Sequence, residues 1–191
     1  MKFENLEELR QACMECRLCG LSNSRTHVVF GKGNPHAQIM FIGEGPGEQE
    51  DVTGEPFVGR AGRLLDKYFY AMDISRDEIY IANMVKCRPP QNRDPSPEEQ
   101  DMCLQHLREQ VRLIKPKMII CLGRIAAQKL IDPGFKVTKQ HGEWMERNGV
   151  LMMGTFHPAS LLRNPAQKPA ALEDFVKIRD KAAELNIRTK K

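Results

Sequence analysis

The chain has 191 residues, a length that suits one domain able to bury a continuous core without disulfides. Lys and Arg number 29 against 25 Asp and Glu, so the formal net charge of +4 allows nucleic acid as a partner without arguing strongly for it. No apolar run reaches the roughly 20 residues that a membrane span needs, and the N-terminus lacks the apolar segment of an export signal. We therefore expect a cytoplasmic protein with no membrane partner.

Helical and strand patterns alternate along the chain. In chain order they predict a helix at 6–13, a strand at 38–43, a helix at 60–72, a strand at 78–85, a helix at 97–115, a strand at 117–122, a helix at 123–131, β-turns at 137–145, a strand at 150–155, a short helix from 158 and a helix at 170–185. The start of the helix at 97 is well marked, because Ser96 suits an N-cap and Pro97 a first turn.

Strands separated by helices of this length imply right-handed crossovers and a parallel sheet covered on both faces. The predicted fold class is therefore α/β, a three-layer α/β/α sandwich around a central, mainly parallel sheet of four strands. Ligands of such sheets bind beyond the carboxyl ends of the strands. The loops after Ile42, Val85, Leu122 and Thr155 should therefore carry the chemistry.

Three of these loops hold unusual motifs. The first, GEGPGEQED at 43–51, continues into PFVGRAG at 56–62; its glycines let the backbone approach a ligand, and its acids argue against a phosphate. NMVKCRPPQNRDP follows the second strand at 83–95, and FHPASLLR follows the last strand at 156–163. Singly, each motif is weak evidence, because glycine turns, proline-rich spacers and isolated histidines are common in proteins of every function.

Together and in this order, the motifs resemble family 4 of the uracil-DNA glycosylase superfamily, and the resemblance runs from about Cys16 to about Arg163. It implies a uracil-DNA glycosylase-like fold and a DNA-repair enzyme that flips uracil out, hydrolyses its N-glycosidic bond with water and leaves an abasic site. We expect residues 1–191 to form one such domain, monomeric and acting on single- or double-stranded DNA that contains uracil. A cysteine-bearing segment at about 1–30 would be tied to this domain by a cluster.

The resemblance assigns several motif residues to a base pocket. Phe57 and Asn83 match the stacking and uracil-reading residues, since a side-chain amide complements O4 and N3–H of uracil and leaves groups of cytosine unpaired. His157 would donate to O2 of the departing uracil. Backbone amides of the glycine turn would assist, which makes Gly43 and Gly45 uracil-binding residues.

The attacking water needs an acceptor that orients it, and the candidates are Glu44, Asn92 and Glu50. Glu44 and Asn92 rank above Glu50, because Glu50 and Asp51 also suit a solvated turn or a helix cap. Gly45 stands where the founding branch of the superfamily carries an Asp, so the identity of the acceptor stays open.

Four further residues are candidates for contact with DNA. Leu161 matches the family's apolar wedge, which fills the gap left by the flipped base, although the same leucine suits a helix core. Arg163 can hold a phosphate, and Arg60 and Ser160 are further phosphate candidates. Lys86 is the one lysine in the motif loops that lyase chemistry could use, and a solvated or phosphate-facing side chain is its plainer interpretation.

The cysteines point to a metal centre, because the cytosol keeps thiols reduced. Cys13, Cys16 and Cys19 form a CxxCxxC run, and Cys87 and Cys103 lie farther along the chain. Four thiolates suit either tetrahedral zinc or a cubane cluster.

The resemblance implies a structural 4Fe–4S cluster bound by Cys16, Cys19, Cys87 and Cys103. Cys16 and Cys19 reproduce the family's spacing to the Arg-Thr pair at 25–26, whereas Cys13 and Cys16 would need an insertion. Cys121, within an apolar strand, suits a core position.

Two other functions stay open. The fold could serve as an iron–sulfur DNA-binding or damage-recognition module with little turnover. A covalent-trapping relative would carry a basic insertion with an extra His after PFVG, and this chain runs on without one. The same chemistry could also act on deaminated adenine or mismatched thymine, and the exclusion of thymine rests on the resemblance alone.

Overall fold

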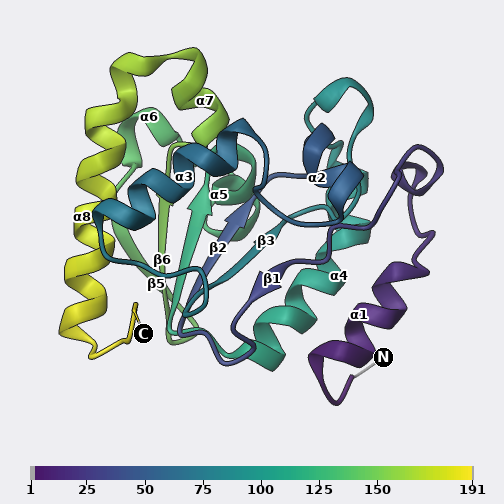
Figure 1. Cartoon of the computed structure of the whole chain (residues 1–191), viewed down its shortest axis with the longest axis horizontal. Helices are drawn as coiled ribbons and strands as arrows, with labels where there is room; N and C mark the ends of the chain where they lie inside the picture. The colour runs from purple at the N-terminus through teal and green to yellow at the C-terminus, as the bar shows by residue number, and fades with distance from the viewer. Residues whose placement is uncertain (1–2, 191) are drawn as a thin grey trace.

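The computed structural model describes residues 3–190, so both ends of the predicted domain 1–191 lie outside the described residues. Six strands form one sheet in the order β1-β3-β2-β4-β6-β5 (Figure 1). Its four central strands are parallel: β3 (Tyr80–Asn83), β2 (Ile39–Gly43), β4 (Met118–Leu122) and β6 (Val150–Thr155). The α/β class is confirmed, and the four predicted strands are all present.

The prediction of only four strands is wrong, because a short antiparallel strand lies at each edge. β1 (Lys32–Gly33) pairs with β3, and β5 (Trp144–Arg147) pairs with β6. Two residues are too few to form a pattern, and β5 is mostly exposed, so neither edge has an apolar alternation. Asn148 and Gly149 join β5 to β6 with φ of 52° and 76°, as in a two-residue type I′ hairpin turn. This Asn-Gly pair is the signal for the hairpin.

Helices cover both faces of the sheet, as a three-layer sandwich requires (Figure 1). One face carries α3 (Arg60–Ala71), α7 (Pro158–Arg163) and α8 (Lys168–Glu184). The other face carries α4 (Pro97–Ile114) and α5 (Arg124–Leu130). Successive residues of a strand point to opposite faces, so Phe41 packs in the first layer and its neighbours Met40 and Ile42 pack in the second.

The remaining elements lie outside these layers. The first helix, α1 (Leu6–Met14), packs against α4 through an apolar cluster of its own. The connections contain η1 (Gly20–Asn23), α2 (Glu48–Thr53), η2 (Pro90–Asn92), α6 (Val137–Gln140) and η3 (Pro165–Gln167). The pattern did not predict α2 or α6, which have six and four residues. None of the helices within residues 3–190 is both long and apolar enough to cross a membrane.

The parallel register brings the motif loops together. Gly43 at the end of β2 lies opposite Asn83 at the end of β3, and Leu122 at the end of β4 lies opposite Thr155 at the end of β6. All three motifs therefore leave the sheet at the same edge.

Phe41 tests how much of the stability comes from the layer under α3 and α8. Its side chain is buried, and its ring centre lies 4.9 Å from that of Phe69 and 6.1 Å from that of Phe175. Phe41→Ala would leave a cavity, so we expect the free energy of unfolding to fall by about 3–5 kcal/mol in urea titrations. Tyr70→Ala removes a ring that is 89% exposed, so as a control it should change this free energy by less than about 0.5 kcal/mol. Equal losses would contradict the prediction.

Candidate functional site

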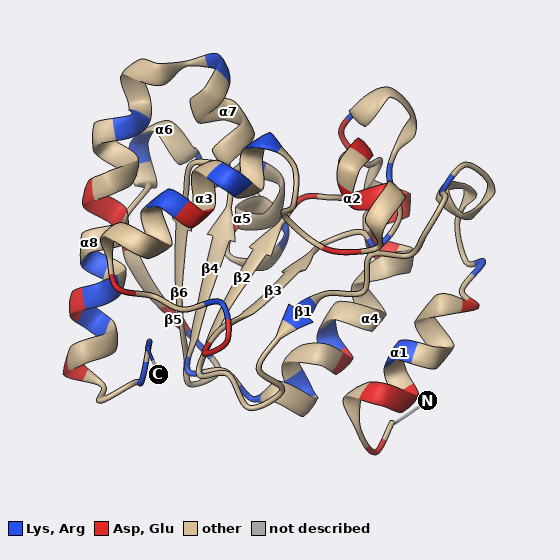
Figure 2. Ribbon diagram, viewed as in Figure 1, with Lys and Arg blue, Asp and Glu red and all other residues tan. Residues whose placement is uncertain are grey.

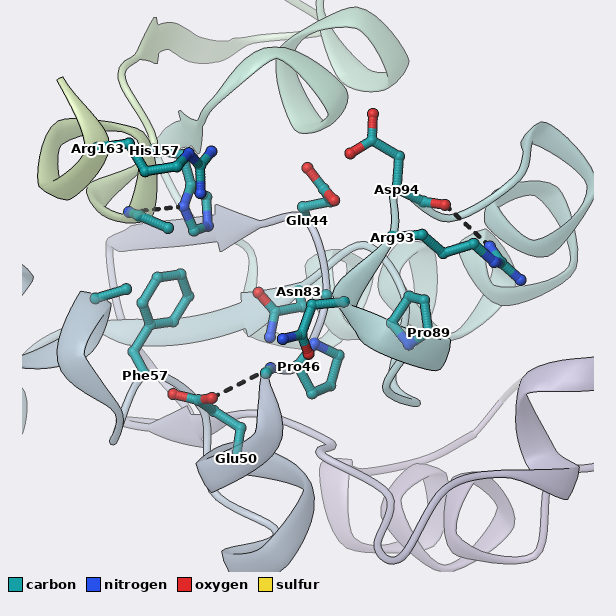
Figure 3. Close-up of a pocket in the computed structure, with 15 residues that line it drawn as sticks. Glu44, Pro46, Glu50, Phe57, Asn83, Pro89, Arg93, Asp94, His157 and Arg163 are labelled. Carbon is teal, nitrogen blue, oxygen red and sulfur yellow. Dashed lines mark hydrogen bonds between the residues drawn. The ribbon is translucent and has the colours of Figure 1, made fainter.

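A cavity of about 300 Å³ opens at the carboxyl edge of the sheet (Figure 3). Its walls come from the loops after β2 and β3, from the start of α3 and from α7. The predicted residues that line it are Glu44, Gly45, Glu50, Phe57, Asn83, Asn92, His157 and Arg163. The structure thus brings all three motifs to one cavity.

Phe57 forms the apolar wall of this cavity on a backbone that is held in an unusual conformation. Its φ is 53°, in the left-handed region that costs a residue with a side chain roughly 1–2 kcal/mol. Arg76 Nη2 donates a hydrogen bond to the Phe57 carbonyl oxygen at 2.7 Å. A Cβ atom on Gly62 would lie 1.8 Å from that same oxygen, so only glycine fits there. These neighbours fix the position of the ring.

Glu50 ties the start of α2 to the start of α3. Its Oε1 accepts the N–H groups of Val58 at 3.0 Å and Gly59 at 2.8 Å, and its Oε2 accepts the N–H of Gly47 at 3.1 Å. Both Glu50 and Asp51 are buried, so the interpretation of this segment as a solvated turn is wrong. The cap interpretation fits, because the Glu50 carboxylate binds the amide just before its own helix.

Asn83 supplies a buried hydrogen-bond acceptor to the cavity. Its Oδ1 is buried and has no hydrogen-bond partner among the residues that the structure describes. A Cβ atom on Gly43 would lie 2.4 Å from this oxygen and 2.6 Å from Cζ of Phe57, so Gly43 keeps open the space between amide and ring. An unpaired buried acceptor costs about 1–3 kcal/mol. Asn83 Oδ1 is therefore the place in this cavity for the N–H of a ligand.

His157 presents a neutral N–H donor. Its Nδ1 accepts the N–H of Ala159 at 3.1 Å, so the neutral ring carries its proton on Nε2. Burial, and secondarily the Arg163 guanidinium, lowers the pKa of His157 to about 4. A Cβ atom on Gly123 would lie 2.8 Å from that of His157, so the glycine after β4 makes room for this residue. The ring centres of His157 and Phe57 are 5.8 Å apart.

Glu44 faces a second carboxyl group, Asp94, which the sequence did not identify (Figure 3). Burial, and then the negative charge of Asp94, raises the pKa of Glu44 to about 7, against the opposing effects of Arg124 and Arg163. Asp94 forms an ion pair with Arg124 at 2.6 Å. Glu44 therefore changes charge near neutral pH. In the sequence, Asp94 is marked only by its position directly after Asn92 and Arg93 in the second motif.

Asn92 lines the cavity from η2, and its acceptor is already bound. The Nε of Arg88 donates to Asn92 Oδ1 at 2.8 Å. Asn92 and its neighbour Gln91 have φ of 55° and 56°, so two consecutive residues of this loop adopt the left-handed conformation. Such strain is typical of loops at functional sites.

The residues predicted to contact DNA differ in their exposure to solvent. Arg60 and Arg163 are exposed, and Figure 2 shows basic residues on α3 near α7. The Ser160 hydroxyl donates to the carbonyl oxygen of His157 at 2.7 Å. Leu161 is 1% exposed and packs in the core under α7. A wedge must be free to enter a duplex, so this burial fits the core interpretation of Leu161 and not the wedge.

A second cavity, between the N-terminal segment and α4, is lined by thiols. Its sulfur-bearing residues include Cys13, Cys16, Cys19, Cys87 and Cys103. Cys19, Cys87 and Cys103 belong to one small apolar cluster, whereas Cys13 packs in the cluster between α1 and α4. The sixth cysteine is buried in β4, as predicted for a core residue.

Hydrogen-bond donors face two of these sulfurs. Arg25 Nη1 donates to Cys87 Sγ at 3.2 Å, and the backbone N–H of Lys86 donates to Cys103 Sγ at 3.3 Å. His106 lines the same cavity, and its buried Nε2 has no partner within residues 3–190. Over that range no three His, Cys, Asp or Glu side chains form a group that could hold a metal ion. The structure thus shows a thiol cavity with donors around it.

Lys86 lies between the two cavities. Its side chain is buried, and its Nζ donates to the Asn83 carbonyl oxygen at 2.9 Å and to Gln110 Oε1 at 2.6 Å. The interpretation of Lys86 as a solvated or phosphate-facing side chain is therefore wrong. Its ammonium group supports the backbone that carries the Asn83 amide.

Comparison with known proteins gives a consistent set of relatives. The family model described as uracil DNA glycosylase superfamily matches residues 30–180. A type-4 uracil-DNA glycosylase of Archaeoglobus fulgidus is 42% identical over 184 residues, which cover 92% of this chain and 92% of the relative. The type-4 enzyme of Thermotoga maritima is 45% identical, with 91% and 93% covered, and that of Sulfurisphaera tokodaii is 40% identical, with 94% and 86% covered.

The carboxyl pair can be tested by titration. Asp94→Asn removes the negative charge that faces Glu44, so we expect the pKa of Glu44 to fall from about 7 toward the usual range of glutamate. Carbon-13 NMR of the labelled Glu carboxyl groups, with Glu44→Gln to assign the signal, measures this midpoint. Asp101→Asn is the control, since Asp101 pairs with Lys129 and not with a pocket residue, and it should leave the midpoint unchanged. An unshifted Glu44 in Asp94→Asn would refute the pairing.

Proposed function

Because the chain belongs to the type-4 uracil-DNA glycosylases, within the uracil-DNA glycosylase superfamily, it hydrolyses the N-glycosyl bond of uracil in DNA, and we propose that the cavity at the carboxyl edge of the sheet is its active site. The observation that carries this proposal is the unpaired Oδ1 of Asn83, which faces Phe57 across Gly43. A module that binds DNA without recognising a base would have no need of this arrangement.

Uracil recognition follows from the donors and acceptors of one amide. N3–H of a flipped uracil donates to Asn83 Oδ1, the Asn83 NH₂ group donates to O4, and the ring stacks on Phe57. Cytosine has no N3–H, so it would leave Asn83 Oδ1 unpaired at a cost of about 1–3 kcal/mol. The exclusion of thymine stays a prediction.

We propose that His157 stabilises the leaving group. As the bond between C1′ and N1 breaks, its electron pair passes to uracil and negative charge develops on O2. The His157 Nε2–H donates to that oxygen, and backbone amides of the turn at 43–47 can assist. The pKa of about 4 keeps the ring neutral at pH 7, so His157 donates a hydrogen bond to O2 and transfers no proton.

We favour Glu44 as the group that orients the water. The oxygens of Glu50 accept three backbone amides, and the Oδ1 of Asn92 accepts from Arg88. The Glu44 carboxylate would accept a proton from the water while the water oxygen bonds to C1′, and the uracil anion takes up a proton from solvent after it leaves. Since no Lys lines the described cavity and Lys86 is bound elsewhere, a monofunctional hydrolase fits better than a lyase.

The surroundings of the pocket suit DNA as the substrate. The exposed guanidinium groups of Arg60 and Arg163 can hold phosphates beside it, whereas the Ser160 hydroxyl is bound to His157. The described chain forms the whole lining of the pocket, so the proposed chemistry needs no second copy. The two main apolar clusters lie on opposite faces of the same sheet, which supports a single domain.

We propose that the thiol cavity binds a 4Fe–4S cluster, which the type-4 family typically has, through Cys16, Cys19, Cys87 and Cys103. The chemistry of the residues fits it, because the four proposed ligands line one cavity together with Cys13, N–H groups already point at two of the sulfurs, and a buried ring nitrogen has no partner there among the described residues. The thiols would draw together around the cluster, since no three of the described side chains form a group that could hold a metal ion. The bound cluster would be a structural cross-link between the N-terminal segment, the loop after β3 and α4. Hydrolysis itself transfers no electron.

The roles of Asn83 and His157 can be separated on uracil-containing oligonucleotides under single-turnover conditions. His157→Ala removes the donor to O2, so we expect the excision rate to fall about 10²- to 10³-fold. Asn83→Ala should lose the preference for uracil over cytosine. Free uracil and alkali-labile strands are the measures. His36→Ala, at an exposed position, should excise at the wild-type rate. Wild-type rates in His157→Ala would overturn its assignment.

The ligand set can be tested by iron analysis. Protein purified without oxygen should contain about four irons per chain and absorb visible light. Cys87→Ser or Cys19→Ser should lose most of this iron, because each removes a proposed ligand. Cys13→Ala should keep it. If Cys13→Ala loses the iron and Cys19→Ser keeps it, the proposed set is wrong.

A further inference from the structure

His106 is a buried polar side chain whose position nothing in the base pocket explains. It lies on α4 three residues after Cys103, and its side chain is 7% exposed. It lines the thiol cavity rather than the base pocket. Its Nε2 has no hydrogen-bond partner among the described residues.

An unpaired ring nitrogen in this position is costly in the protein alone. Leaving a buried polar group without a partner costs about 1–3 kcal/mol, and folded proteins rarely do so without a reason. A neutral imidazole nitrogen can donate or accept, but the two basic side chains that line this cavity already donate elsewhere, Arg25 to Cys87 and Met14 and Lys86 to Asn83 and Gln110. With these donors bound, the partners that the cavity offers to His106 Nε2 are acceptors, its sulfur atoms.

A bound iron–sulfur cluster supplies such acceptors. Its sulfur atoms carry negative charge, and donors already reach two of the surrounding thiols, from Arg25 to Cys87 and from Lys86 to Cys103. His106 would be a third donor, on the side of the cavity formed by α4. Hydrogen bonds to the sulfurs are one of the factors that set the stability and the reduction potential of a cluster.

We propose that the His106 Nε2–H donates a hydrogen bond to a sulfur of the bound cluster, and so retains the cluster and raises its reduction potential. This inference rests on the proposed cluster. The direction follows from charge, because a donor stabilises the reduced, more negative state. Excision transfers no electron, so His106 acts on the cluster and not on the reaction.

The test compares His106→Leu, which has no donor, with His106→Gln, whose amide keeps one, in cluster-loaded protein. In His106→Leu we expect shifted Fe–S stretching bands in resonance Raman spectra, a lower midpoint potential and several-fold faster loss of iron to a chelator. His106→Gln should lie close to wild type. Gln105→Leu, at the exposed neighbouring position, is the control and should change none of these. The inference would be overturned if His106→Leu had the Fe–S stretching bands, the midpoint potential and the rate of iron loss of the wild type.

Two further results keep the inference separate from the cluster proposal and from folding. Wild-type protein without iron would overturn both proposals, whereas four irons per chain with an unaltered His106→Leu would overturn this one alone. If His106→Leu does not fold, pulsed EPR of the reduced wild-type cluster with ¹⁵N-labelled histidine takes its place. A weak coupling to a histidine nitrogen is expected, and either no coupling or the strong coupling of a direct iron ligand would reject the hydrogen bond.

Discussion

A buried side-chain oxygen that finds no donor within residues 3–190, Oδ1 of Asn83, is the feature around which the proposed base pocket is arranged. The parallel register sets Asn83 opposite Gly43, where the lack of a side chain leaves space in front of the amide. Lys86 holds the Asn83 backbone from behind. A fixed acceptor that is shielded from water discriminates strongly between ligands. A ligand without the matching N–H leaves this oxygen without a hydrogen bond, so the free-energy cost of the unpaired acceptor remains after binding.

The sequence predicts the central strands and the convergence of the motifs, because both follow from local patterns and one topological rule. Asn83 and His157 each follow a recognisable strand, and the carboxyl ends of parallel strands meet. The edge strands carry no such pattern, because β1 has two residues and β5 is mostly exposed. Arg76 carries no local signal, since its bond to the Phe57 carbonyl depends on tertiary packing. The burial of Leu161 likewise depends on how α7 rests on the sheet.

The two cavities are physically connected through a short stretch of chain. The backbone N–H of Lys86 binds the sulfur of Cys103, and its ammonium group binds the carbonyl oxygen of Asn83. Gln110 of α4 completes the connection by accepting from Lys86 and donating to the carbonyl oxygen of Phe30. Lys86 therefore links the packing around Cys103 to the placement of Asn83.

The left-handed backbone of Phe57 has a consequence for what the pocket can accept. Arg76 binds the carbonyl oxygen of Phe57, and Gly62 packs against the same backbone. These contacts restrict movement of the Phe57 backbone, so the ring cannot shift with it to fit ligands of different shape. In the proposed pocket, a ring held in this way would favour flat heterocycles, because a puckered or bulky base would need the Phe57 backbone to move.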